Sequence, residues 1–286
     1  MIVRNYSINY VFLIGFIFMF GRSNTFAQED GIQFKLDSLE DKIAQASHDT
    51  IRCKLLLEQG FLLLPKDSVK AVQKFDRSIE LAKENNWEKT FKIFHEIGMT
   101  YEHYGYMDAC ESYLWKAIHE CIKVESSFEL GRMHHDLGVA FHIENEYDSA
   151  RFHYNKVIEI AIKNNHPKLL GSGYNDRGNL ALYESDLSDA LKYYLLGLKV
   201  REAIQDSLGI SGSINNIGLV YLRLEDYENA LEYHKRSLDI AEIRDNDLQR
   251  SIAYANMGTD SINLKDFENA IDCLDKALEI RKKRDS

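Results

Sequence analysis

Residues 214–241, INNIGLVYLRLEDYENALEYHKRSLDIA, decide the fold of this chain. Ile214, Ile217, Gly218 and Tyr221 occupy the i, i+3, i+4 and i+7 positions that share one face of an α-helix. After a polar turn at residues 224–226, a second helical face contains Ala230, His234, Ser237 and Ala241. The stretch therefore predicts two antiparallel helices joined by a short turn.

The same pattern returns along the chain with a period of forty residues. A forty-residue shift superposes three columns: Gly98, Gly138, Gly178, Gly218 and Gly258; Cys110, Ala150, Ala190, Ala230 and Ala270; and Ala117, Val157, Gly197, Ser237 and Ala277. A fixed period between 20 and 50 residues indicates stacked supersecondary units. A glycine inside a helix costs about 1 kcal/mol relative to alanine. Its five occurrences therefore indicate that the two helices of each unit approach closely.

This pattern closely resembles the tetratricopeptide repeat. The resemblance lies in the glycine, the aromatic residue three positions later (Tyr101, Phe141, Tyr221), the small residue twelve positions after the glycine and another seven beyond it. It covers residues 91–286 as five repeats, and a degenerate repeat at residues 51–90 precedes them. The resemblance implies an all-α fold, a right-handed α-α superhelix (TPR solenoid) of about six helix-turn-helix repeats. Because these units exceed the usual thirty-four residues, we expect longer helices with looser turns.

The first residues predict export. A cationic start at Arg4, a twelve-residue apolar run over residues 10–21 and the sequence Thr-Phe-Ala before Gln28 are typical of a signal peptide, residues 1–27, cleaved after Ala27. A retained N-terminal anchor is the alternative, but the apolar run is shorter than the ~20 residues of a membrane-spanning helix. We expect a periplasmic or secreted protein without stable membrane insertion after cleavage, with an N-terminal capping helix at residues 28–50.

Charge and cysteine content exclude several classes of function. The chain after residue 27 has 33 basic and 45 acidic residues, a net charge of −12. Nucleic acids and anionic membranes are disfavoured partners, because phosphate binding draws its affinity from clustered Lys and Arg. The spacing of Cys53, Cys110, Cys121 and Cys273 fits neither a zinc ribbon nor a disulfide framework. We expect small buried apolar residues at these positions.

The sequence contains no motif of a catalytic site. There is no GxSxG sequence, no glycine-rich phosphate loop and no Cys/His pair in a catalytic context. We therefore predict a protein that is not an enzyme and that uses no cofactor.

The resemblance implies that the first helix of each repeat lines a concave groove. The predicted partner-binding residues on it are Asn216, Asn256, Asn215, Asn175, Asn179, His135, Asp136 and His95. Asparagine has donors and an acceptor on a short side chain, so a row of asparagines can hold an extended peptide backbone. Polar side chains that simply face water are the alternative. His135, His142 and His95 lack the spacing of a known metal motif, and we predict no metal site.

Arg177 interrupts an otherwise apolar column of the first helices. The equivalent positions hold Ile97, Leu137, Ile217 and Met257. A long cationic side chain in such a column can extend its guanidinium group to the surface. We therefore expect Arg177 to reach water in this way or to pair with a nearby acid.

Two functions fit these observations. The first is an exported, non-enzymatic scaffold that binds a peptide or protein segment in its concave groove, with possible self-association through an uncapped C-terminal repeat. The alternative rests on a resemblance: forty-residue arrays with a signal peptide and an opening such as LDSLEDKIAQASHDTIR look like extracytoplasmic input regions of bacterial sensor histidine kinases and LuxR-type regulators. The chain would then be a ligand-sensing input region or a truncated relative.

Overall fold

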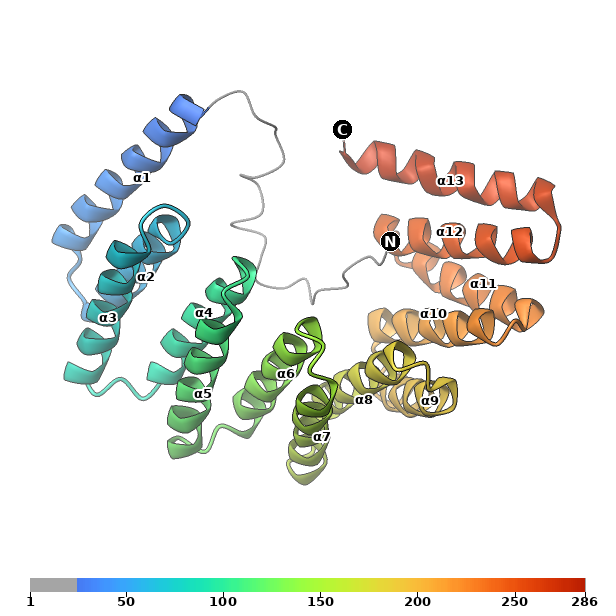
Figure 1. Ribbon diagram of the computed structural model, residues 1–286, viewed down its shortest axis with the longest axis horizontal. Helices are drawn as coiled ribbons and strands as arrows, with labels where there is room; N and C mark the ends of the chain where they lie inside the picture. The colour runs from blue at the N-terminus through green and yellow to red at the C-terminus, as the bar shows by residue number, and fades with distance from the viewer. Residues whose placement is uncertain (1–24, 286) are drawn as a thin grey trace. The chain divides into compact units, whose positions relative to one another are not determined.

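The computed structural model describes residues 25–285 and contains only α-helices in this range (Figure 1). The first 24 residues of the predicted signal peptide lie outside the described residues, and its last three begin helix α1. None of the described helices is both long and apolar enough to cross a membrane. The prediction of an all-α array of helix pairs is confirmed.

The chain divides into two compact units at Asn85 and Asn86. The first unit contains α1 (Thr25–Gln45), α2 (Asp49–Leu63) and α3 (Ser68–Glu84). The second unit contains five helix pairs: α4 (Thr90–His103) with α5 (Met107–Lys123), α6 (Ser127–Ile143) with α7 (Tyr147–Lys163), α8 (Pro167–Tyr183) with α9 (Leu187–Ala203), α10 (Ser207–Arg223) with α11 (Tyr227–Ile243), and α12 (Asp247–Asn263) with α13 (Phe267–Asp285). The domain boundaries expected after residues 50 and 90 remain predictions.

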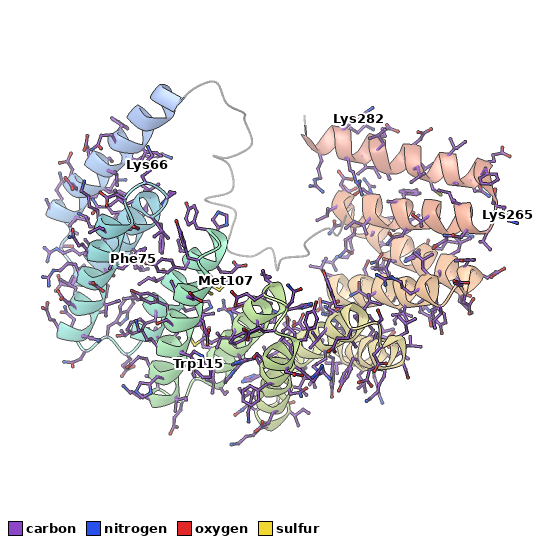
Figure 2. All side chains as sticks on the ribbon, viewed as in Figure 1. Lys66, Phe75, Met107, Trp115, Lys265 and Lys282 are labelled. Atoms are coloured by element: carbon purple, nitrogen blue, oxygen red, sulfur yellow. The ribbon has the colours of Figure 1, made fainter. Side chains whose placement is uncertain are left out.

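The first unit is held by a close contact between α2 and α3. Phe75 of α3, labelled in Figure 2, is fully buried and packs on Phe61 with 5.6 Å between ring centroids. A Cβ atom on Gly60 would lie 2.2 Å from the Phe75 ring. The hydroxyl of Ser78 donates to the carbonyl of Cys53 at 3.0 Å, which satisfies a polar group inside this core.

In the second unit, the first helices of successive pairs contact one another. The backbone of α4 comes close to that of α6, and the same holds from α6 to α8, α10 and α12, whereas the backbones of successive second helices from α5 to α13 stay farther apart. Closer spacing on one side makes a row bend toward that side. The first helices therefore lie on the inner side of the bend in this unit, as the row from α4 to α10 shows in Figure 1.

The repeated glycine of each first helix makes room for a side chain of the second helix, sixteen residues later. A Cβ atom on Gly138 would lie 2.5 Å from the ring of Tyr154, and one on Gly178 would lie 2.6 Å from the ring of Tyr194. Both tyrosines are at most 2% exposed. The expected close approach is thus mainly that of a large side chain to a backbone, and a side chain at Gly138 or Gly178 would displace a core tyrosine.

The turns between helices are tight, so the expectation of looser turns is wrong. Every helix from α5 to α12 has 17 residues, and each helix from α4 to α12 is followed by a three-residue turn. The middle residue of these turns has a positive φ every twenty residues, at Gly105, Glu125, Asn145, Asn165, Ser185, Gln205, Glu225, Asp245 and Lys265. After α6, for example, the amide of Glu146 donates to the carbonyl of Phe141 at 2.9 Å. This is a Schellman motif, and Glu146 is also the N-cap of α7.

Candidate functional site

Polar side chains connect neighbouring first helices at equivalent positions. In each connection, the residue three before the repeated glycine meets the residue two before the glycine of the next first helix, forty-one positions later. We call this set the first-helix ladder; its pairs are His95 with Asp136 (2.6 Å), His135 with Asp176 (3.2 Å), Asn175 with Asn216 (3.0 Å) and Asn215 with Asn256 (2.8 Å). The structure thus brings together seven of the eight predicted site residues.

The charged half of the ladder centres on His135. Its Nδ1 lies 3.0 Å from Asp136, and its Nε2 lies 3.2 Å from Asp176. Burial alone would lower the pKa of His135, but the negative charge of Asp176 and the contacts with Asp136 outweigh burial and raise this pKa well above 6.5. His135 is therefore cationic at neutral pH and bridges two carboxylates.

The pKa of Asp136 is shifted in the opposite direction from that of His135. Burial would raise the pKa of its carboxyl group, but hydrogen bonds with His135 and His95 lower the pKa well below the usual value of 3.8. The side chains of His95 and Asp136 are each only 15% exposed. The charged half is consequently a partly desolvated network whose groups are already engaged with one another.

The amide half of the ladder retains hydrogen-bonding capacity. Asn216 donates one amide hydrogen to Asn175, and Asn256 donates one to Asn215. The carbonyl oxygen of Asn256 has no hydrogen-bond partner among the described residues, and each donor amide keeps a second hydrogen. All four side chains are half-buried. A ligand on the inner side of the bend could therefore bind these amides without breaking the ladder.

Arg201 of α9 reaches the ladder where its two halves meet. Its Nη1 donates to Ser213 at 2.7 Å and to the carbonyl of Gly209 at 3.0 Å, and it lies 3.5 Å from Asn175. Burial lowers the pKa of Arg201, and the negative charges of Asp176 and Asp206 partly offset this effect. The side chain also packs against Gly171. Arg201 thus supplies a second cation near Asp176.

Sequence reasoning missed Arg201, although a signal was available. The equivalent positions of the neighbouring second helices hold Cys121, Ala161 and Ala241, so among the internal repeats an arginine breaks a column of small residues, and only the last repeat has a second arginine there, Arg281. The space for it comes from Gly171 and Gly209, where a Cβ atom would approach its side chain to 3.1 Å and 2.7 Å. A large charged residue in a small column, with extra glycines beside it, indicated a half-buried cation.

Asn179 and Arg177 have other partners. The hydroxyl of Tyr194 donates to the Asn179 carbonyl at 2.9 Å, so Asn179 supports a core tyrosine and stands apart from the ladder. The Arg177 guanidinium lies 4.8 Å from the ring centroid of Tyr193, and its Nη2 lies 3.4 Å from that hydroxyl. Arg177 is buried, and among residues 25–285 no carboxylate lies within ion-pair distance of it. The expected surface exposure or acid partner is replaced by a cation–π contact.

No cluster typical of a metal site or an activated nucleophile occurs in the described part of the chain. No group of three or more His, Cys, Asp or Glu residues is arranged there to hold a metal ion. All four cysteines are free and buried, as expected. Burial raises the pKa of Cys110 to about 12 and that of Cys121 to about 11, which keeps both thiols protonated and unreactive at neutral pH.

Comparisons with known proteins agree with this architecture. Residues 210–283 match the sequence model of the tetratricopeptide repeat. No curated protein matches the chain in sequence. The structure is similar to that of BtubC (BKLC) from P. vanneervenii, with a TM-score of 0.59, 18% identity and coverage of 87% of this chain and 93% of that chain.

Two further solved structures are similar. A Rap protein complexed with competence and sporulation factor has a TM-score of 0.62 and 13% identity, with coverage of 88% of this chain and 76% of that chain. The apo form of the quorum sensor NprR from B. thuringiensis has a TM-score of 0.55 and 14% identity, with coverage of 89% and 85%. At these identities the likeness concerns the fold alone. Residues 210–283 are thus identified as tetratricopeptide repeats, and the chain has the fold of helical repeat proteins.

Proposed function

We propose that the chain is a non-enzymatic scaffold that holds an extended peptide or protein segment on the inner side of its second unit. The amide half of the first-helix ladder is the binding surface, with Asn216 and Asn256 as its main contacts. The observation that carries this proposal is the set of half-buried amides that are fixed by hydrogen bonds to one another, while each donor amide keeps a free hydrogen and the Asn256 carbonyl keeps a free acceptor.

The geometry of the amides supports a backbone ligand. An extended peptide presents alternating N–H and C=O groups, and a fixed side-chain amide can pair with both. Because the ladder holds each amide in place, a ligand does not bear the full entropic cost of ordering these side chains. The Rap protein with a similar fold is complexed with competence and sporulation factor, which is a precedent for ligand binding by this fold.

We propose that the charged half fixes the orientation of the bound peptide and marks one end of the binding surface. His135 is paired on both sides, and Asp136 accepts from two histidines, so these groups have fewer free hydrogen-bonding sites for a neutral peptide backbone. Their fixed charges would instead select the ligand side chain at that end. His95, His135 and Asp136 thus remain predicted contacts for specificity.

The test is a selection of random twelve-residue peptides displayed on phage against the purified protein. Selected peptides are then titrated by calorimetry against wild type and the Asn216→Ala/Asn256→Ala variant. We expect at least tenfold weaker binding to the variant, because each hydrogen bond to the peptide contributes on the order of 1 kcal/mol. The control is Asn155→Ala, since Asn155 is exposed on α7, outside the ladder.

Thermal unfolding must show that the double variant is folded at the titration temperature. Equal affinity for wild type and the folded double variant would contradict the proposed site. A selection that yields no peptide with wild-type protein, while a known tetratricopeptide domain processed in parallel yields binders, would contradict the proposed function itself.

We also propose that the chain is exported after cleavage following Ala27, to the periplasm or the medium. The support is the pattern of residues 1–27. Mass spectrometry of the protein recovered from the periplasmic fraction tests this proposal. An N-terminus at Gln28 is expected, whereas an uncleaved chain in the cytoplasm or the membrane fraction would contradict it.

The second candidate function is a ligand-sensing input region. It is favoured by the similar fold of the quorum sensor NprR and by the opening at residues 36–52. The sequence that follows Ser286 in the source genome, together with the adjacent gene, separates the candidates. A membrane helix joined to a kinase or DNA-binding module would favour the sensor, and its absence would favour the scaffold.

A further inference from the structure

Helix α13 carries an apolar stripe that the described chain leaves exposed. Phe267, Ile271, Leu274 and Leu278 are 61%, 64%, 40% and 49% exposed. Their spacing of four, three and four residues is that of the a and d positions of a coiled-coil seam. The stripe is therefore suited to packing against another helix.

Equivalent residues in earlier repeats show that such a stripe is normally covered. At the column of Leu278, Ile118 is 4% exposed and both Leu198 and Leu238 are 8% exposed. Leu238 of α11, for example, packs with Ala253 and Met257 of α12. Within residues 25–285, no helix covers α13 in this way. Each exposed apolar side chain would gain about 1.5 to 3 kcal/mol if a partner fully buried it.

The charges on α13 are divided between its two ends. Residues 267–275 contain three acidic side chains and no basic one, whereas residues 276–285 contain five basic and two acidic side chains. The basic end includes Lys282, which lies near the end of the helix in Figure 2. Lys276 pairs with Asp272 within the helix at 2.6 Å. Glu268, Arg281 and Lys282 have no ion-pair partner in the described part of the chain.

We propose that α13 binds α13 of a second copy of this chain in antiparallel orientation. This orientation places Phe267 opposite Leu278 of the second copy and Ile271 opposite its Leu274. It also places Arg281 of the second copy about one helical turn beyond the position opposite Glu268, so that the basic end of one helix passes the acidic start of the other. A parallel pair would instead bring like charges together, which opposes association.

The interface is small. One helix from each copy buries about 1,000 Å² or less in total, near the lower limit of specific interfaces. We expect a dissociation constant on the order of tens of micromolar and therefore a concentration-dependent equilibrium between monomer and dimer. The symmetry is two-fold and closed, so the assembly stops at the dimer.

The first test is sedimentation velocity of the full chain between about 5 and 300 µM, with its N-terminus determined by mass spectrometry. Wild type is expected to shift from monomer to dimer over this range. Ile271→Glu is expected to stay monomeric, whereas the control Ile162→Glu, at a similarly exposed residue of α7, dimerises like wild type. A wild type that is monomeric throughout, or an equal loss of dimer in both variants, overturns the proposal.

Charge reversal tests the orientation. Glu268→Arg and the pair Arg281→Glu/Lys282→Glu are each expected to weaken dimerisation at least fivefold, and all three changes in one chain are expected to restore it. These side chains are exposed, so the variants should fold, and circular dichroism checks this. A triple variant as weak as the single reversals would contradict antiparallel pairing.

Discussion

The two halves of the first-helix ladder connect neighbouring helices by the same geometry but with different chemistry. Between α4 and α8, the connections are His95 with Asp136 and His135 with Asp176. Between α8 and α12, both connections are asparagine pairs. The comparison separates two demands on such a surface: charged pairs give strong and pH-dependent coupling between repeats, whereas amide pairs give weaker coupling but leave groups free for a ligand.

The largest expected effect comes from a histidine pair outside the ladder. This pair shows that the environment, and not the residue type, decides whether the pKa of a histidine is raised or lowered. The buried rings of His134 and His153 meet with Nδ1 atoms 2.9 Å apart, and burial lowers the pKa of each to about 4. Their neutral form is fully compatible with the fold above pH 6.5. Stability should fall between pH 6.5 and 4 as the unfolded chain takes up protons, by on the order of 3 kcal/mol for each histidine.

Replacing both histidines by leucine should remove this acid sensitivity. Urea unfolding midpoints between pH 4 and 7.5 measure it, with wild type in parallel. Asp136 titrates below this range and is unchanged in both proteins. A double variant whose midpoint falls as steeply as that of wild type between pH 6.5 and 4 would show that other groups cause the destabilisation.

The second prediction compares the two halves directly. Asp136→Ala should destabilise the second unit by about 2 to 3 kcal/mol, because two histidines lose a partly buried acceptor. Asn216→Ala should cost about 1 kcal/mol, since only neutral hydrogen bonds are removed. Urea unfolding at pH 7 measures both changes. Equal costs would mean that the charged pairs contribute no more than the amides.

The third prediction converts part of the charged half into an amide. The raised pKa of His135 contributes stability that is fully present below the unfolded pKa of about 6.5 and is lost as pH rises through the folded-state pKa. His135→Asn should therefore cost more at pH 6 than at pH 9, with a difference of about 1 kcal/mol. Thermal melting of both proteins at these two pH values provides the measurement. An equal cost at both values would assign a neutral state to His135.

The smallest effect concerns the turns, where the two halves should differ little. Asn145 of the charged half and Ser185 of the amide half have φ values of 63° and 62°. Ser185→Gly should stabilise by about 0.5 to 1 kcal/mol, and Asn145→Gly by less, because asparagine tolerates this conformation better than serine. Melting temperatures measure the gain. A lower melting temperature for Ser185→Gly would indicate an unrecognised role of its side chain.

The sequence predicted the repeat, the helix pairs and the helix face on which the first-helix ladder lies. These follow from periodic columns such as Gly98 to Gly258, which depend on local spacing alone. It did not predict that His95 would pair with Asp136, because a single helix face does not reveal which residues of the next helix lie opposite it. The positive φ at Ser185, Glu225 and Lys265 was also hidden, because these residues do not have the usual left-handed preference of glycine or asparagine.

The contacts between first helices also have a mechanical meaning. The second unit is a curved strip whose backbones come closest along its inner edge, since the backbones of successive second helices stay farther apart between residues 107 and 285. Flattening the strip would bring the more widely spaced second helices toward one another, whereas tighter curling would press the first helices, which already lie close together, into each other. The unit should therefore resist closing more than opening, so its inner edge can open to admit a ligand but does not curl tightly around it.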